Sequence, residues 1–162
     1  MSRSGVSKPH LAVLVAAVIV IVGGFSSSSV AEEQNASSPT LADLMTLTQL
    51  RHFKLWYAQR LDNWDLAAYE LGQFETTIAR IVKLYPTTSS IAQANLIHEK
   101  TDPAMSDLRQ AIVDKSISRF ESAYGQITSA CNQCHQAAKV GFIVIQNPTR
   151  SPFSNQSFEP LR

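Results

Sequence analysis

Two cysteines and a histidine stand close together near the end of the chain, in the run Cys131-Asn132-Gln133-Cys134-His135. On a helix, this spacing puts both thiols on one side of the backbone, about one turn apart. Two such thiols can add to the two vinyl groups of one porphyrin, and the histidine that follows can bind its iron. The pattern is that of covalent c-type haem attachment. We therefore predict one heme c, held by Cys131 and Cys134, with His135 as an iron ligand.

Three other uses of the cysteine pair have to be compared with haem attachment. A thioredoxin-like redox pair is usually accompanied by a neighbouring strand-helix-strand pattern, and the sequence shows no such pattern. A disulfide between residues three apart on a helix would close a very small loop against the specific geometry of that bond. A zinc site would need further ligands, and besides His135 the chain offers only His10, His52 and His98. The sequence favours haem over all three.

Residues 1–31 have the composition of a cleaved secretory signal peptide. Two basic residues precede an apolar run that begins at Leu11, and small residues lead up to Ala31, after which we expect the cut. An uncleaved membrane anchor is the alternative. Even extended to Phe25 the run has 15 residues, which is short of the roughly 18 of a spanning helix. We expect a bacterial periplasmic protein with no stable membrane span.

The mature chain would be residues 32–162, which is a usual length for one domain. It carries 12 basic and 13 acidic residues without a basic patch, so nothing indicates a nucleic-acid partner. We divide it into a flexible N-terminal segment at 32–40, a haem-binding domain at 41–140 and a C-terminal extension at 141–162. The extension contains the apolar run Phe142–Ile145, and we expect it to pack on the domain.

Apolar residues recur every three or four positions through the domain, which predicts an all-α protein. Asp62-Asn63 should break the first helix and cap the second, and Pro86 should end the second. Asp102 and Pro103 look like the start of the third helix, with Asp as N-cap. The connection 87–101 before it is ambiguous. The predicted helices are therefore 41–60, 64–85, 103–115 and 117–140.

Both cysteines continue the apolar seam of the last helix, together with Ile127 and Ala138. They should therefore face the interior. Four helices with mostly short connections predict an antiparallel four-helix bundle that has the haem-attachment motif near the end of its last helix.

A helical bundle with its Cys-x-x-Cys-His near the end of the last helix resembles the class II cytochromes c, which include cytochrome c′ and its low-spin relatives. The specific part of the resemblance is residues 131–135. Two departures are the 27 residues that follow His135 and the lack of a basic residue at Gln136 or Ala137. The resemblance also implies a helix-packed homodimer.

The resemblance further implies that residues near the start of the first helix lie level with His135. In the low-spin relatives a methionine at this place is the sixth iron ligand, and that role falls on Met45. The alternative for Met45 is an ordinary core methionine. His52 is the rival ligand, about 10 Å further along the helix axis, where a haem propionate would be its other partner. Arg51 and Lys54 could bind propionates or simply face solvent.

Two functions follow. The first is a one-electron carrier, not an enzyme, that exchanges electrons with redox partner proteins through a closed, six-coordinate haem. The alternative is a five-coordinate protein of the cytochrome c′ type that binds nitric oxide or carbon monoxide. The role of Met45 distinguishes the two functions.

Overall fold

The computed structural model describes residues 38–87, 93–151, 153 and 155–160. The expected signal peptide and most of the expected flexible segment fall outside these residues, as do the middle of the second connection and the last two residues of the chain. The described parts contain four helices and no strand, so the all-α prediction is confirmed. The helices are α1 (Leu41–Arg60), α2 (Trp64–Leu84), α3 (Gln93–Val113) and α4 (Ile117–Ala137).

The first two helices begin with side-chain caps. The backbone N–H of Asp43 donates to Thr40 Oγ1 at 3.2 Å, and the N–H of Thr40 donates to Asp43 Oδ2 at 2.9 Å, which makes a capping box at the start of α1. Asn63 caps α2 by accepting from the N–H of Leu66 at 3.1 Å. The predicted break at Asp62-Asn63 is confirmed.

The predicted start of α3 is wrong, because the helix begins ten residues earlier, at Gln93, and runs through Pro103. Ile97 is buried on the same side of the helix as Met105 and Leu108, so the apolar stripe continues across the proline. Pro103 itself is exposed, and the carbonyl that it leaves without a helical partner can bind water. Burial of the earlier turns therefore outweighs the helix-breaking tendency of proline.

Helices α1, α3 and α4 end in the same way. In each, a non-glycine residue takes a left-handed conformation just after the helix: Asp62 (φ 53°), Lys115 (φ 49°) and Lys139 (φ 60°). At the end of α4 the N–H of Lys139 donates to Gln136 O and that of Val140 to His135 O, which is a Schellman motif. The left-handed residue turns the chain away, so α4 ends at Ala137 and not at residue 140 as predicted.

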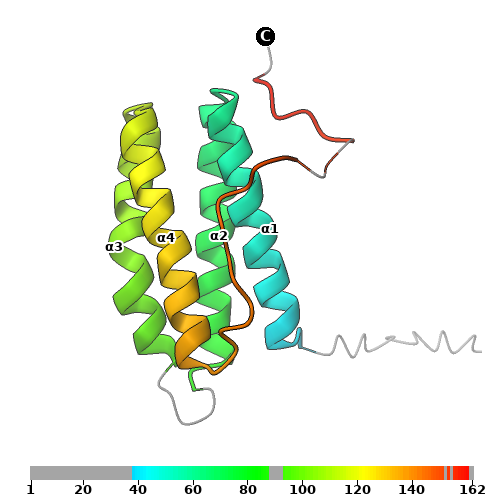
Figure 1. Ribbon diagram of the computed structural model, residues 1–162, viewed down its shortest axis with the longest axis vertical. Helices are drawn as coiled ribbons and strands as arrows, with labels where there is room; N and C mark the ends of the chain where they lie inside the picture. The colour runs from blue at the N-terminus through cyan, green and yellow to red at the C-terminus, as the bar shows by residue number, and fades with distance from the viewer. Residues whose placement is uncertain (1–37, 88–92, 152, 154, 161–162) are drawn as a thin grey trace, which may run out of the picture. The chain divides into compact units, whose positions relative to one another are not determined.

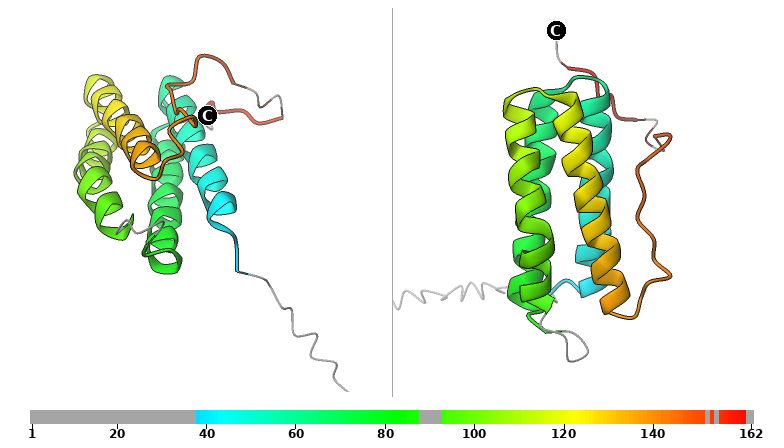
Figure 2. Two further views of the ribbon diagram at one scale, coloured as in Figure 1. Left: turned by 60° about the horizontal axis from the view of Figure 1, so that its bottom comes forward. Right: turned by 60° about the vertical axis from the view of Figure 1, so that its left-hand side comes forward.

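The helices run alternately up and down, and each packs along its neighbour in sequence (Figure 1). Contacts are extensive between α1 and α2 and between α3 and α4, and moderate between α2 and α3. In contrast, α1 and α4 barely touch. This is the arrangement of a four-helix bundle in which one of the four helix pairs is held apart (Figure 2).

The core consists of two clusters of buried side chains. The sealed half, as we call it, lies where α1 ends and α2 begins, and comprises Leu55, Ala58, Ala67, Leu71, Leu108, Ala111, Ile112, Phe120, Ala123 and Tyr124. The open half lies where α1 begins and α4 ends, and comprises Leu44, Phe74, Ile78, Ile81, Ile97, Ala104, Met105 and Ile127. Met45, Cys131 and Cys134 are partly buried against the open half. The predicted site residues therefore gather at one end of the bundle.

After α4 the chain turns back and runs along the bundle toward its other end (Figure 1). We call residues 141–151, 153 and 155–160 the C-terminal strap. It contacts α1 through the ring of Phe153, which packs edge-on against Phe53 with centroids 5.4 Å apart. Near its end, Asn63 Nδ2 donates to the carbonyl of Phe158 at 3.0 Å, and the Phe158 side chain is buried. The strap thus connects the end of α4 with the start of α2.

Among the helices that the structure describes, none has the length and apolar character needed to cross a membrane.

Candidate functional site

A cavity of about 600 Å³ occupies the open half, on the side where α1 and α4 are held apart. This volume lies within the range of about 300–1,000 Å³ typical of sites for small molecules and cofactors. No lysine, arginine, aspartate or glutamate lines it. The walls come from α1 (Leu41, Ala42, Met45, Thr46, Thr48, Gln49, His52), α2 (Ile78), α3 (Leu96, Ile97, Thr101), α4 (Cys131, Cys134, His135) and the segment after it (Ala138, Val140, Ile143, Ile145).

Cys131 and Cys134 lie on the last two turns of α4, and both thiols are free. Burial raises the pKa of Cys131 to about 12, and burial also raises the pKa of Cys134, although the charge of Lys100 opposes the shift there. Both thiols are therefore protonated near neutral pH. Thiol–disulfide exchange needs a thiolate, which this environment disfavours.

The imidazole of His135 is oriented by the strap. Its Nδ1 lies 2.7 Å from the carbonyl oxygen of Ile143. A carbonyl oxygen only accepts, so Nδ1 carries the proton, and in the neutral ring Nε2 keeps its lone pair. Histidine ligands of metals commonly donate their other ring N–H to a carbonyl in this way. His135 is thus held in the tautomer that an iron ligand requires.

Met45 lines the same cavity from α1, on the wall formed by the first turns of that helix. It is half-buried and packs on the same core cluster as both cysteines. Met45 therefore shares this cavity with Cys131, Cys134 and His135. Its thioether sulfur is a soft donor of the kind that binds haem iron.

His52 also lines the cavity, but both of its ring nitrogens have protein partners. Nδ1 lies 2.9 Å from the Tyr124 hydroxyl and Nε2 lies 2.9 Å from Thr128 Oγ1. The ring is 3 % exposed and stacks on Tyr124 with centroids 4.2 Å apart. Burial lowers its pKa to about 4, so the ring is neutral. Binding iron through Nε2 would break the bond to Thr128.

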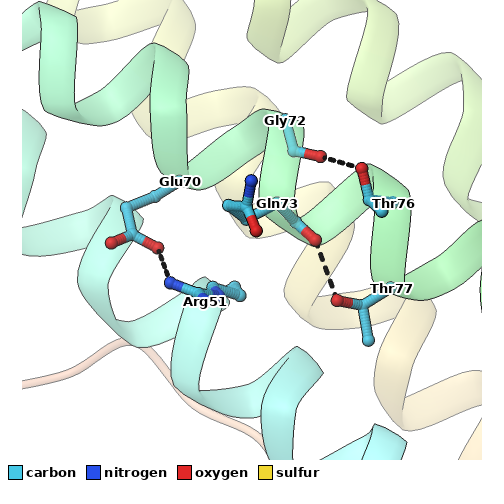
Figure 3. A network of polar contacts seen from close by, with 6 residues as sticks. All are labelled: Arg51, Glu70, Gly72, Gln73, Thr76 and Thr77. Atoms are coloured by element: carbon cyan, nitrogen blue, oxygen red, sulfur yellow. Dashed lines mark hydrogen bonds and ion pairs between the residues drawn. The ribbon is translucent and has the colours of Figure 1, made fainter.

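The other polar residues considered from the sequence point elsewhere. Arg51 forms an ion pair with Glu70 of α2 at 3.0 Å (Figure 3), and the Glu70 side chain is 2 % exposed. Lys54 lies 5.4 Å from the centre of the Phe153 ring in the strap. His98 is exposed and pairs with Asp102 at 3.0 Å. None of the three lines the cavity.

Sequence reasoning missed Asn132, between the two cysteines. Its side chain binds the backbone of Ile145 twice, through Nδ2 to the carbonyl at 2.9 Å and through Oδ1 from the N–H at 2.8 Å. Ile143 and Ile145, which line the cavity, belong to the apolar run Phe142–Ile145 of the C-terminal extension, whereas Phe142 and Val144 of the same run are 82 % and 69 % exposed. This apolar run was the only feature of the sequence that indicated a contact between the extension and the domain, and it did not indicate that Asn132 would bind there.

The residues present fit a haem better than a bare metal ion. No group of three or more His, Cys, Asp or Glu side chains gathers at any point in the described residues, as a protein-ligated zinc site would require. A porphyrin supplies four ligands to its iron and needs from the protein only axial donors and an apolar slot. His135 from α4 and Met45 from α1 both line the cavity, and its other walls are mainly apolar.

Comparisons with known proteins add no relative: no protein-family model matches the chain, and no similar curated protein or solved structure was found.

Proposed function

We propose that the chain is an exported monohaem c-type cytochrome that carries single electrons between redox partner proteins. The observation that supports this most strongly is the wall formed by Cys131, Cys134 and His135. All three line one cavity of about 600 Å³. Because His135 Nδ1 donates its proton to the carbonyl of Ile143, the lone pair of Nε2 is left to bind iron. The proposal accounts for the motif, the cavity and the tautomer together.

When bound, heme c would supply one iron centre that gains or loses a single electron. The protein's part is attachment, orientation and exclusion of water. Cys131 and Cys134 would hold the group by thioether bonds, and His135 would bind its iron through the lone pair of Nε2. No charged Lys, Arg, Asp or Glu side chain lines the cavity, so a net charge on the bound haem would be poorly stabilised. The polarity of the surroundings is one of the ways in which a protein sets the reduction potential of a haem.

Met45 is the residue that would supply the second protein ligand to the iron. It lines the cavity from α1, and its sulfur has no competing hydrogen bond among the contacts of the described residues. His52 is the weaker choice, because both ring nitrogens are engaged with Tyr124 and Thr128. Histidine–methionine ligation closes the iron to small ligands and raises its potential, which suits an electron carrier.

The lining of the cavity as a whole, which is mainly apolar and has no charged Lys, Arg, Asp or Glu side chain, also favours a second function. If Met45 packs against the haem without binding iron, the cavity would admit an uncharged diatomic molecule, and the protein would bind nitric oxide or carbon monoxide.

Optical spectra of the purified full chain test the proposal. We expect a covalently bound haem, with no reaction of the reduced protein with carbon monoxide. Met45→Ala should open the iron to carbon monoxide, whereas His52→Gln should not. Met105→Ala is the matched control, because Met105 is buried in the same core cluster but does not line the cavity.

Carbon monoxide binding by the unaltered protein would overturn the carrier function in favour of gas binding. A protein isolated with no haem after expression together with the haem-attachment machinery, as judged by its mass, would overturn both.

A further inference from the structure

We propose that Asn132 is a positioning residue that fixes the C-terminal strap and, through it, the orientation of His135. The proposal rests on the haem function proposed above. Asn132 lies inside the attachment motif, but its side chain has no place in the attachment chemistry. Instead it pairs with both backbone polar groups of Ile145, at 2.8 and 2.9 Å. A neighbouring β-strand would satisfy an extended residue through the same two groups.

The residue held by Asn132 is two positions from the residue that orients the histidine. Ile143 accepts the hydrogen bond from His135 Nδ1 at 2.7 Å, and Ile145 is bound by Asn132. On the helix, Asn132 and His135 are three residues apart and lie about one turn from each other on one side. On the strap, Ile143 and Ile145 both bond to α4 through their backbone groups, and both line the cavity. Helix and strap are thus joined at two matched points.

The contact between Asn132 and Ile145 fixes the contact between Ile143 and His135. Ile143 lies in the turn that follows α4, and its N–H donates to the carbonyl of Val140 at 2.9 Å. Ile143 is 45 % exposed, so burial of its side chain contributes little to holding this residue in place. Without the two hydrogen bonds at Ile145, the carbonyl of Ile143 would lose its fixed position opposite Nδ1 of the imidazole. His135 Nδ1–H would then bond to water.

This hydrogen bond matters for the iron because a carbonyl that accepts from Nδ1–H makes the other ring nitrogen a stronger donor. A stronger donor stabilises the more highly charged ferric iron. Loss of the Asn132 contact should therefore raise the reduction potential. It should also weaken the bond between the iron and His135.

Gln133, the other residue between the cysteines, provides the matched control. It is exposed, and its side chain donates only to Ser129 on the preceding turn of α4. Gln133→Ala changes the same motif without touching the strap. Ile145→Pro supplies a second, independent variant, because it removes the N–H that Asn132 Oδ1 accepts and leaves Asn132 unchanged.

The first experiment uses the full chain produced without haem, so that it does not depend on the proposed function. Amide hydrogen exchange and the ¹⁵N shifts of the His135 ring are recorded for the unaltered chain, Asn132→Leu and Gln133→Ala. We expect the Ile145 amide to exchange roughly tenfold faster in Asn132→Leu, as for the loss of a hydrogen bond. The preference for a proton on Nδ1 should fall as well. Gln133→Ala should change neither.

The second experiment measures the reduction potential of the haem-loaded protein. Asn132→Leu removes both hydrogen bonds to Ile145 and should raise the potential most, whereas Ile145→Pro removes only the bond to the N–H and should raise it less. The double variant should raise it no further than Asn132→Leu, because the two changes act on one contact. Unchanged exchange and ring shifts in Asn132→Leu would overturn the proposal. So would a potential equal to that of Gln133→Ala. A chain that never carries haem would refute the proposed function but leave the first experiment decisive.

Discussion

The sealed and open halves of the bundle are built from the same four helices but differ in the size of their buried residues. In the sealed half each helix contributes one alanine that is at most 1 % exposed: Ala58, Ala67, Ala111 and Ala123. Small residues at a contact let helix axes approach more closely. The open half has a single alanine, Ala104, and its large side chains come mainly from α2 and α3.

The difference shows how one sequence provides both a stable core and an internal space. In the open half α1 contributes only Leu44 to the buried cluster and α4 only Ile127. The two helices therefore have little to bury against each other there, and the cavity lies between them. The sealed half holds the helices together, and the open half encloses the cavity.

The strongest test of this division is a large-to-small change in each half. Phe120 is 0 % exposed in the sealed half, so Phe120→Ala should cost about 3–5 kcal/mol of unfolding free energy. Met45 borders an existing cavity, so Met45→Ala should cost far less. Urea unfolding of the chain with both cysteines changed to alanine would measure both without a contribution from attached cofactor. Equal costs would contradict the division.

The second test concerns His52, which lines the cavity but bonds to Tyr124 of the sealed half. Its pKa is lowered to about 4 from an ordinary value of 6.5, so between these values the unfolded chain binds more protons than the folded one. Stability should therefore rise with pH across this window, by up to about 3 kcal/mol. It should fall as the pH is lowered from 6.5 toward 4.

Unfolding free energies measured from pH 4 to 7 would check this, with His52→Gln expected to lose most of the dependence. His98→Gln is the control, because His98 is exposed, and it should keep the dependence of the unaltered chain. A slope that survives in His52→Gln would show that other groups cause it.

The smallest expected effect concerns the capping box at the start of α1. Thr40→Ala removes the side-chain oxygen that caps the helix and should cost about 1 kcal/mol. Because Thr40 is next to the cavity wall at Leu41, hydrogen exchange should speed up in the first turns of α1 and not in its last turns. Uniformly faster exchange along α1 would mean that the two halves unfold as one unit.

Much of the fold could be predicted from the sequence, because the relevant signals are local and periodic. The spacing of apolar residues identified all four helices, and Thr40 and Asn63 are capping residues of the expected kind. The start of α3 could not be predicted, because the helix-breaking tendency of Pro103 is visible locally whereas the burial of Ile97 depends on the other helices. The end of α4 depends on one left-handed lysine, which has no sequence signature.

The candidate site likewise has a part that could be predicted from the sequence and a part that could not. The motif specified Cys131, Cys134 and His135, since attachment chemistry fixes both residue types and spacing. It gave no indication of the contacts that surround them. Asn132 binds a backbone, Arg51 is paired with a buried glutamate, and His52 is held by two hydroxyl groups. Such contacts join residues far apart in the chain without any periodic pattern.

The path of the C-terminal strap has a consequence for synthesis of the protein. The cavity wall includes Ile143 and Ile145, and the strap is fastened again where Asn63 binds the carbonyls of Phe158 and Glu159. Because chains grow from the N-terminus, these wall residues are made after all four helices. A chain that stopped just after α4 would contain every residue of the Cys-x-x-Cys-His motif but would lack one side of its cavity.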